Sequence, residues 1–126
     1  MAISVETNGP TAVHAVTDRI EAAIPADVDG LVTVFVRHTT AGVVVNEPES
    51  RLLEDFETFL EDLVPDEGWQ HDRLDGNADA HLRATLLGES VTVPVSAGEL
   101  DLGRWQAVLL VECDGPRTRS IDVVVH

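Results

Sequence analysis

The stretch LVTVFVRHTTAGVVVN, residues 31–46, decides the fold because it holds two strands separated by a polar break. Residues 31–36 are dense in β-branched and apolar side chains, which is typical of a strand buried on both faces. Gly42 predicts a bend, and residues 43–45 predict a second strand. The polar residues between them therefore end a buried strand, where a rigid scaffold commonly holds functional side chains.

Downstream, hydrophobic periodicity predicts a helix over about residues 49–63, because apolar residues recur one and three positions apart. This apolar stripe consists of Leu52, Leu53, Phe56, Phe59, Leu60 and Leu63. Pro65 ends the helix. The polar segment 66–79 predicts a loop, and a shorter helix over about residues 80–87 ends at Gly88, a natural C-terminal cap.

The other apolar stretches are short and predict strands and one further helix. The predicted strands are residues 3–6, 12–16, 90–95, 105–113 and 119–125. Thr17 or Asp18 caps a short helix, Pro94 marks an edge or a bulge, and residues 96–99 form a hairpin turn. With about six or seven strands, mostly adjacent through hairpins, we expect an α+β fold with a mixed, mostly antiparallel sheet and two or three helices.

Length and composition indicate one globular domain, residues 1–126. This length fits a single domain, and a hydrophobic content of 44% excludes a disordered acidic chain. No apolar run approaches the roughly 18–20 residues that span a bilayer. The first residues lack the layout of a signal peptide. We therefore expect a soluble, cytoplasmic protein.

The charge balance narrows the class of partner. The chain has 23 acids against 8 bases, a formal net charge of −15, and every base is arginine. Such a lysine-free, acidic surface is typical of a salt-rich cytoplasm, which screens carboxylate repulsion. It also argues against nucleic acid and anionic membranes as partners. The single cysteine, Cys113, excludes an internal disulfide and a CxxC metal site, and its apolar strand favours a buried, inert thiol.

Three polar segments, residues 37–42, 71–81 and 112–117, combine glycine with side chains that could bind a metal or exchange protons. His38, His71 and His81, with nearby carboxylates, are suitable ligands for a divalent ion such as Zn²⁺ or Mg²⁺. Their spacing leaves open whether the fold brings them together. The alternative is structural: His38 bonded to backbone, His81 on a helix surface and His71 in solvent.

Several common catalytic and nucleotide-binding motifs are missing from the sequence. The chain contains no HExxH, GxxxxGK[ST], GxGxxG or GxSxG motif, which excludes the zincin, P-loop, Rossmann and α/β-hydrolase interpretations.

Glu112 follows apolar neighbours and needs a partner if its carboxylate faces inward. Arg117 and Arg119 alternate along one strand and could simply neutralise surface acids.

Four blocks, in order, resemble those of the YjbQ family. They are His38-Thr39-Thr40-Ala41-Gly42 with Asn46-Glu47, then Gly76-Asn77-Ala78-Asp79-Ala80-His81 with Leu86-Leu87-Gly88, then residues 90–95 with Gly98, Leu100, Leu102-Gly103 and Trp105-Gln106, and last Glu112, Asp114-Gly115-Pro116-Arg117 and Arg119. Together they cover most of the chain between residues 31 and 125. Around His71 this chain departs from the family pattern.

The resemblance implies a compact α+β fold, a homotrimer, and thiamine-phosphate synthase activity described for the family as secondary. That reaction joins a pyrimidine diphosphate to a thiazole phosphate and expels pyrophosphate. The family's polar motif residues map onto His38, Thr39, Thr40, Asn77, Asp79, His81, Glu112 and Arg117.

From this mapping we expect His38, His81 and Glu112 to form the reactive or metal-binding cluster, in a pocket for a small anionic metabolite. Asp79 and Asn77 would shape its surroundings, alongside Thr39 and Thr40. Arg117 and Arg119 would hold anionic oxygens. Two alternatives remain: a binding module without catalysis, and polar blocks that only support a trimer interface.

Overall fold

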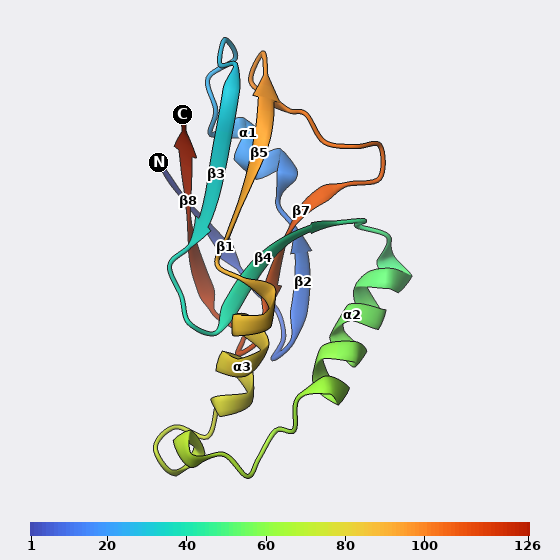
Figure 1. Cartoon of the computed structure of the whole chain (residues 1–126), viewed down its shortest axis with the longest axis vertical. Coiled ribbons are helices and arrows are strands. Elements are labelled where there is room, and N and C mark those ends of the chain that lie inside the picture. The colour runs from blue at the N-terminus through green and yellow to red at the C-terminus, as the bar shows by residue number, and fades with distance from the viewer.

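Eight strands form two antiparallel sheets in a computed structural model that describes residues 1–126 (Figure 1). The larger sheet contains, in spatial order, β1 (Ala2–Glu6), β8 (Thr118–Val125), β3 (Gly30–Val36), β5 (Ser90–Ser96) and β6 (Glu99–Leu100). The smaller contains β2 (Ala12–Ala15), β7 (Ala107–Glu112) and β4 (Ala41–Asn46). The α+β class is confirmed, but every strand pair is antiparallel and the sheet is divided in two.

The chain passes between the sheets six times, so what the sequence predicted as one sheet is divided in two, and three of these passages bear on the site. Residues 7–11 connect β1 to β2, residues 37–40 connect β3 to β4, and residues 113–117 connect β7 to β8. The pairings Glu6↔Thr118 and Ala41↔Glu112 place these three connections at the same end of the two sheets. Two of the polar segments found in the sequence are therefore sheet-crossing connections.

β7 is the central strand of a three-layer packing. Val108 and Leu110 belong to a core of 16 residues shared with the larger sheet and α1 (Thr17–Ala22). Leu109 and Val111 belong to a core of seven residues on the helical side. All six residues of β7 are buried, as expected for a strand covered on both faces. The smaller sheet thus lies between the larger sheet and the two later helices, over residues 50–63 and 78–87.

The prediction that residues 31–36 are buried on both faces is wrong. In β3 the alternating residues Val32, Val34 and Val36 are buried, whereas Leu31 and Phe35 are exposed. No helix of the chain covers the outer face of the larger sheet, so one face of this apolar strand stays open. This uncovered face bears on the oligomeric state proposed below.

The helices occur where periodicity predicted them: α2 spans Ser50–Leu63 and α3 spans Ala78–Leu87. α2 packs against β2 and β7 through the seven-residue core, and of its apolar stripe only Leu60 is fully buried. The predicted loop 66–79 contains a short 3₁₀ helix, η1 (Gln70–Arg73). None of these helices is long and apolar enough to cross a membrane.

Two local predictions are corrected by tertiary contacts. Gly42 lies inside β4, paired with Val111, rather than at a bend. A Cβ there would come within 2.7 Å of Leu87 Cβ, so glycine is needed for the end of α3 to approach the strand. Thr17 does not cap α1, because its hydroxyl oxygen accepts a hydrogen bond from the Val108 N–H at 2.9 Å.

Candidate functional site

A buried ion pair fastens the three sheet-crossing connections together. Glu112, at the end of β7, is 0% exposed, and Arg119, in β8, is 2% exposed. Arg119 Nε donates to Glu112 Oε1 at 2.8 Å, and its Nη2 donates to the other carboxylate oxygen and to Thr40 Oγ1. The Thr7 hydroxyl and the Asp114 N–H also donate to the carboxylate, at 2.7 and 2.9 Å. Each of the three connections thus makes at least one hydrogen bond with the Glu112–Arg119 ion pair.

The environment of Glu112 keeps it ionised and enclosed. Burial alone would raise the pKa of Glu112, but hydrogen bonds from Arg119, Thr7 and the Asp114 backbone outweigh it and hold that pKa below its ordinary value of 4.5. Neither Glu112 nor Arg119 lines the clefts described below. The two residues therefore lie behind the open site, and Arg119 neutralises a buried acid rather than a surface one.

His38 follows β3 and is held by the backbone next to this pair. Its Nε2 accepts a hydrogen bond from the Ser120 N–H at 2.9 Å, so the neutral ring carries its proton on Nδ1. Burial, followed by the nearby Arg119 guanidinium, lowers the pKa of His38 below 6.5. At neutral pH this side chain is an uncharged imidazole with an N–H donor.

His81 lies at the centre of three adjoining hollows. It lines a hollow of about 340 Å³ with His38, so the structure brings together two histidines whose proximity the sequence left open. The His71 and His81 rings meet edge to face, with centroids 4.9 Å apart at 85°. His71 Nε2 also lies 3.5 Å from Asp75 Oδ2. His71 is thus packed against the site rather than free in solvent.

Another of the three hollows that His81 lines is a polar cleft of about 540 Å³, without an apolar lining residue. Its lining consists of Thr39, Thr40, Asp75, Gly76, Asn77, His81, Asp114 and Arg117. Arg117 donates to the Asp114 carbonyl and carboxylate, both at 2.7 Å, and Asn77 Nδ2 donates to the same carboxylate at 2.9 Å. Asn77 stands at the start of α3 without capping it, because its side chain is tied to Asp114.

These side chains do not make a preformed metal centre. No three His, Cys, Asp or Glu side chains converge closely enough to hold an ion. His38 Nε2 already accepts a backbone hydrogen bond, which leaves only Nδ1 for any ligand. We therefore assign no chemical role to a metal.

Asp79 is engaged elsewhere, by a residue that the sequence analysis missed. Arg83 is only 4% exposed and pairs with Asp79 one helical turn away. Its Nε and Nη2 donate to the carbonyls of Leu60 and Val64, both at 2.7 Å, at the end of α2. The i, i+4 spacing of Asp79 and Arg83 was the available signal.

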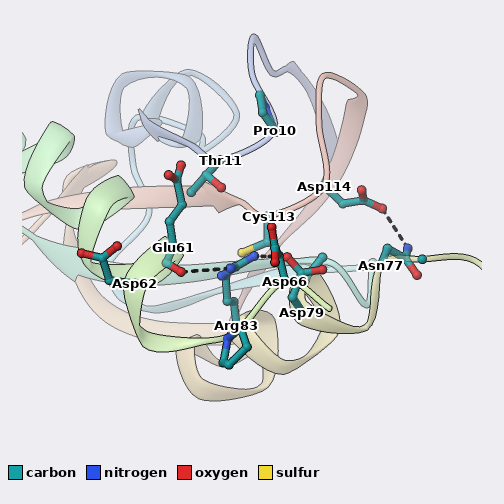
Figure 2. Close-up of a pocket in the computed structure, with 13 residues that line it drawn as sticks. Pro10, Thr11, Glu61, Asp62, Asp66, Asn77, Asp79, Arg83, Cys113 and Asp114 are labelled. Carbon is teal, nitrogen blue, oxygen red and sulfur yellow. Dashed lines mark hydrogen bonds and ion pairs between the residues drawn. The ribbon is translucent and has the colours of Figure 1, made fainter. Parts of the chain in front are cut away.

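Arg83 and Asp79 face a hollow of about 730 Å³ between the ends of α2 and α3, shared with Glu61, Asp62, Asp66, Cys113 and Asp114 (Figure 2). Burial raises the pKa of the Cys113 thiol to about 12, which agrees with the expectation of an inert cysteine.

Comparison with known proteins identifies the family. The sequence profile described as "UPF0047 protein YjbQ-like" matches residues 1–126. The chain belongs to the YjbQ (UPF0047) family. A UPF0047 protein of Archaeoglobus fulgidus is 51% identical over 124 residues, covering 98% of either chain. A UPF0047 protein of Methanothermobacter thermautotrophicus is 53% identical over 98 residues, 77% of this chain and 68% of the relative.

Crystal structures of YjbQ-like proteins share the whole fold. The hypothetical protein APE1520 of Aeropyrum pernix K1 has a TM-score of 0.95 and 42% identity, covering 100% of this chain and 96% of its own. A YbjQ-like protein of unknown function (SSO2532) of Sulfolobus solfataricus P2 has a TM-score of 0.87 and 39% identity, covering 98% and 92%.

Membership of the YjbQ family corrects the expected activity. These relatives are described only as UPF0047, hypothetical or unknown-function proteins, so nothing in the comparison supports thiamine-phosphate synthase activity. The geometry agrees, because expulsion of pyrophosphate requires strong cationic stabilisation of the leaving group. Arg117 is the one arginine lining the polar cleft, and Asp114 already pairs with it.

Proposed function

We propose that the polar cleft binds a small anionic metabolite. The observation that carries this proposal is the position of Arg117, whose guanidinium is held by two bonds to Asp114 at the edge of a cleft without apolar lining. A guanidinium has five N–H donors, so donors remain for phosphate or carboxylate oxygens. Asp114 does not repel such a ligand strongly, because Arg117 neutralises its carboxylate and the uncharged Asn77 amide donates a hydrogen bond to it.

We also propose that His38 and His81, which lie near the cleft, exchange protons with the bound ligand. Thr39 and His81 line both the cleft and the His38 hollow, so the two spaces adjoin. A ligand held by Arg117 therefore lies in the same cleft as His81, with His38 lining the adjoining hollow. An uncharged imidazole with one fixed tautomer is suited to donate a hydrogen bond to a ligand oxygen.

Removing Arg117 is expected to weaken anion binding. In titration calorimetry with inorganic phosphate, Arg117→Ala should lower the affinity about tenfold, the usual effect of losing a charge-assisted hydrogen bond. Arg104→Ala is the matched control, because Arg104 is exposed and stacks on Trp105 away from the cleft. Equal phosphate affinity in wild type and Arg117→Ala, or an equal loss in Arg104→Ala, would contradict the proposal.

We also infer a homotrimer that covers the open face of the larger sheet. Leu31, Phe35 and Val124 are 43%, 38% and 48% exposed and place apolar side chains beside the polar Thr33 and Asp122, on a face with no helix over it. Surfaces of this kind commonly mark protein interfaces. Light scattering should give about three times the chain mass of 13.6 kDa, and Phe35→Lys should reduce it. A wild-type mass of one chain would refute this inference.

A further inference from the structure

Thr7, the first residue of the connection between β1 and β2, lies between the buried ion pair and the main chain of Arg117. It is 6% exposed and lines none of the three hollows around His81. Its backbone N–H donates to the Arg117 carbonyl at 2.8 Å, which continues the antiparallel pairing of Val5 with Arg119 beyond the end of β1. The main chains of Thr7 and Arg117 are therefore fixed in register with each other.

The Thr7 hydroxyl forms a second link between the same two residues. Its oxygen accepts a hydrogen bond from the Arg117 N–H at 2.9 Å. The hydroxyl has a single proton, and the Glu112 carboxylate receives it at 2.7 Å, because that oxygen is charged and lies closer than the Arg117 carbonyl at 3.0 Å. Donation to a carboxylate polarises the hydroxyl and strengthens the bond that its oxygen accepts. Glu112 thus holds the Arg117 main chain through one side chain.

The connection between β7 and β8, which contains Arg117, packs tightly against the connection that contains Thr7. A Cβ at Gly115 would lie 2.9 Å from Thr7 Oγ1 and 2.3 Å from the Gly9 carbonyl oxygen, so only glycine allows this approach. The Gly115 N–H also donates to the Pro10 carbonyl at 3.3 Å. The two connections therefore form one packed unit beside the cleft.

The Arg117 side chain depends on its main chain for its place at the cleft. Its guanidinium is bonded to the carbonyl and carboxylate of Asp114, three residues earlier in the same turn. These bonds fix the shape of the turn, and one further bond joins Asp114 to Asn77 across the cleft. Thr7 provides the partners of the Arg117 N–H and carbonyl alike. The position of the Arg117 backbone relative to the protein core is therefore set by Thr7.

We propose that Thr7 is a positioning residue for the anion site: its hydroxyl couples the buried Glu112 to the Arg117 main chain and so sets where the guanidinium meets the ligand. Thr7 has this role only if the polar cleft binds an anion, so the inference rests on the proposed function. Because Thr7 lines no part of the cleft, its effect on binding passes through Arg117.

Titration calorimetry with inorganic phosphate tests this role. Thr7→Val replaces the hydroxyl with a methyl group of similar size and should lower the phosphate affinity about fivefold, as expected for one lost hydrogen bond. Thr7→Ser keeps the hydroxyl and should stay within about twofold of wild type. Thr11→Val is the matched control, because Thr11 lies in the same connection and lines no part of the polar cleft. It should also stay within about twofold of wild type.

A double substitution separates positioning from a general loss of structure. In the Arg117→Ala protein, Thr7→Val should lower the phosphate affinity by less than about twofold, because the guanidinium that Thr7 positions is already absent. Urea denaturation shows which variants are folded, and Thr7→Ala replaces Thr7→Val in both backgrounds if the valine variant does not fold.

The outcomes distinguish this role from the anion site itself. Unchanged phosphate affinity in Thr7→Val, an equal loss in Thr7→Ser, or a full additional loss in the Arg117→Ala background overturns the positioning role and leaves the anion site standing. Failure of wild type to bind phosphate overturns the anion site and the role of Thr7 together.

Discussion

Replacing Arg83 with alanine is expected to lower the free energy of unfolding by about 3–5 kcal/mol, the usual cost of breaking a buried ion pair. The substitution leaves Asp79 mostly buried, at 16% side-chain exposure, without its counter-charge. It also leaves the carbonyls of Leu60 and Val64 without donors at a helix end that has no basic residue of its own. Urea denaturation measures the loss.

Two variants control this prediction. Arg83→Lys keeps the charge but lacks the planar fork that reaches Asp79 and two carbonyls together, so it should lie between wild type and Arg83→Ala. Arg51→Ala removes an arginine that is 89% exposed on α2 and should change stability by less than about 0.5 kcal/mol. A loss below about 1 kcal/mol in Arg83→Ala would show that α2 and α3 do not depend on this guanidinium.

Arg83 also shows where prediction from the sequence stops. The apolar periodicity of residues 49–63 is local and was sufficient to predict α2, whose bounds are Ser50–Leu63. The donor for its last carbonyls comes from another helix about 20 residues later, and no local pattern specifies that contact. The same holds for Gly42, where the nearest atoms belong to the end of α3.

The candidate site was predictable in composition but not in arrangement. The block from Glu112 to Arg119 was identified, yet Glu112 is the last residue of the fully buried strand β7, whereas Asp114 lies in the bend that follows and lines the cleft. Arg117 and Arg119 divide in the same way: one is exposed in a turn and the other is buried in β8. Only the packing of the two sheets determines which of these charges a ligand can meet. Adaptation to high salt and the cellular compartment stay predictions.

Glu112→Gln is expected to lower the free energy of unfolding by about 3–5 kcal/mol at neutral pH, because Arg119 would stay buried without its counter-charge. The amide keeps the shape of the carboxylate, so the loss of unfolding free energy measures the removal of the charge rather than the creation of a cavity. The pKa of Glu112 is lowered in the folded protein, so its stabilising contribution is complete above the ordinary value of 4.5. That contribution is lost as pH falls through the folded-state pKa, and the difference between wild type and variant should shrink over that range.

A double substitution decides whether the pair serves stability or the position of the site. Replacing a buried ion pair by apolar residues commonly restores stability, so Glu112→Leu with Arg119→Met should be more stable than either single variant. Simple addition of the two single losses would contradict the coupling. Arg119 also holds Thr40 through Nη2, and Ser120, the next residue, holds His38. If the pair positions the site, the folded double variant should lose phosphate affinity, because both anchors of the 37–40 connection shift.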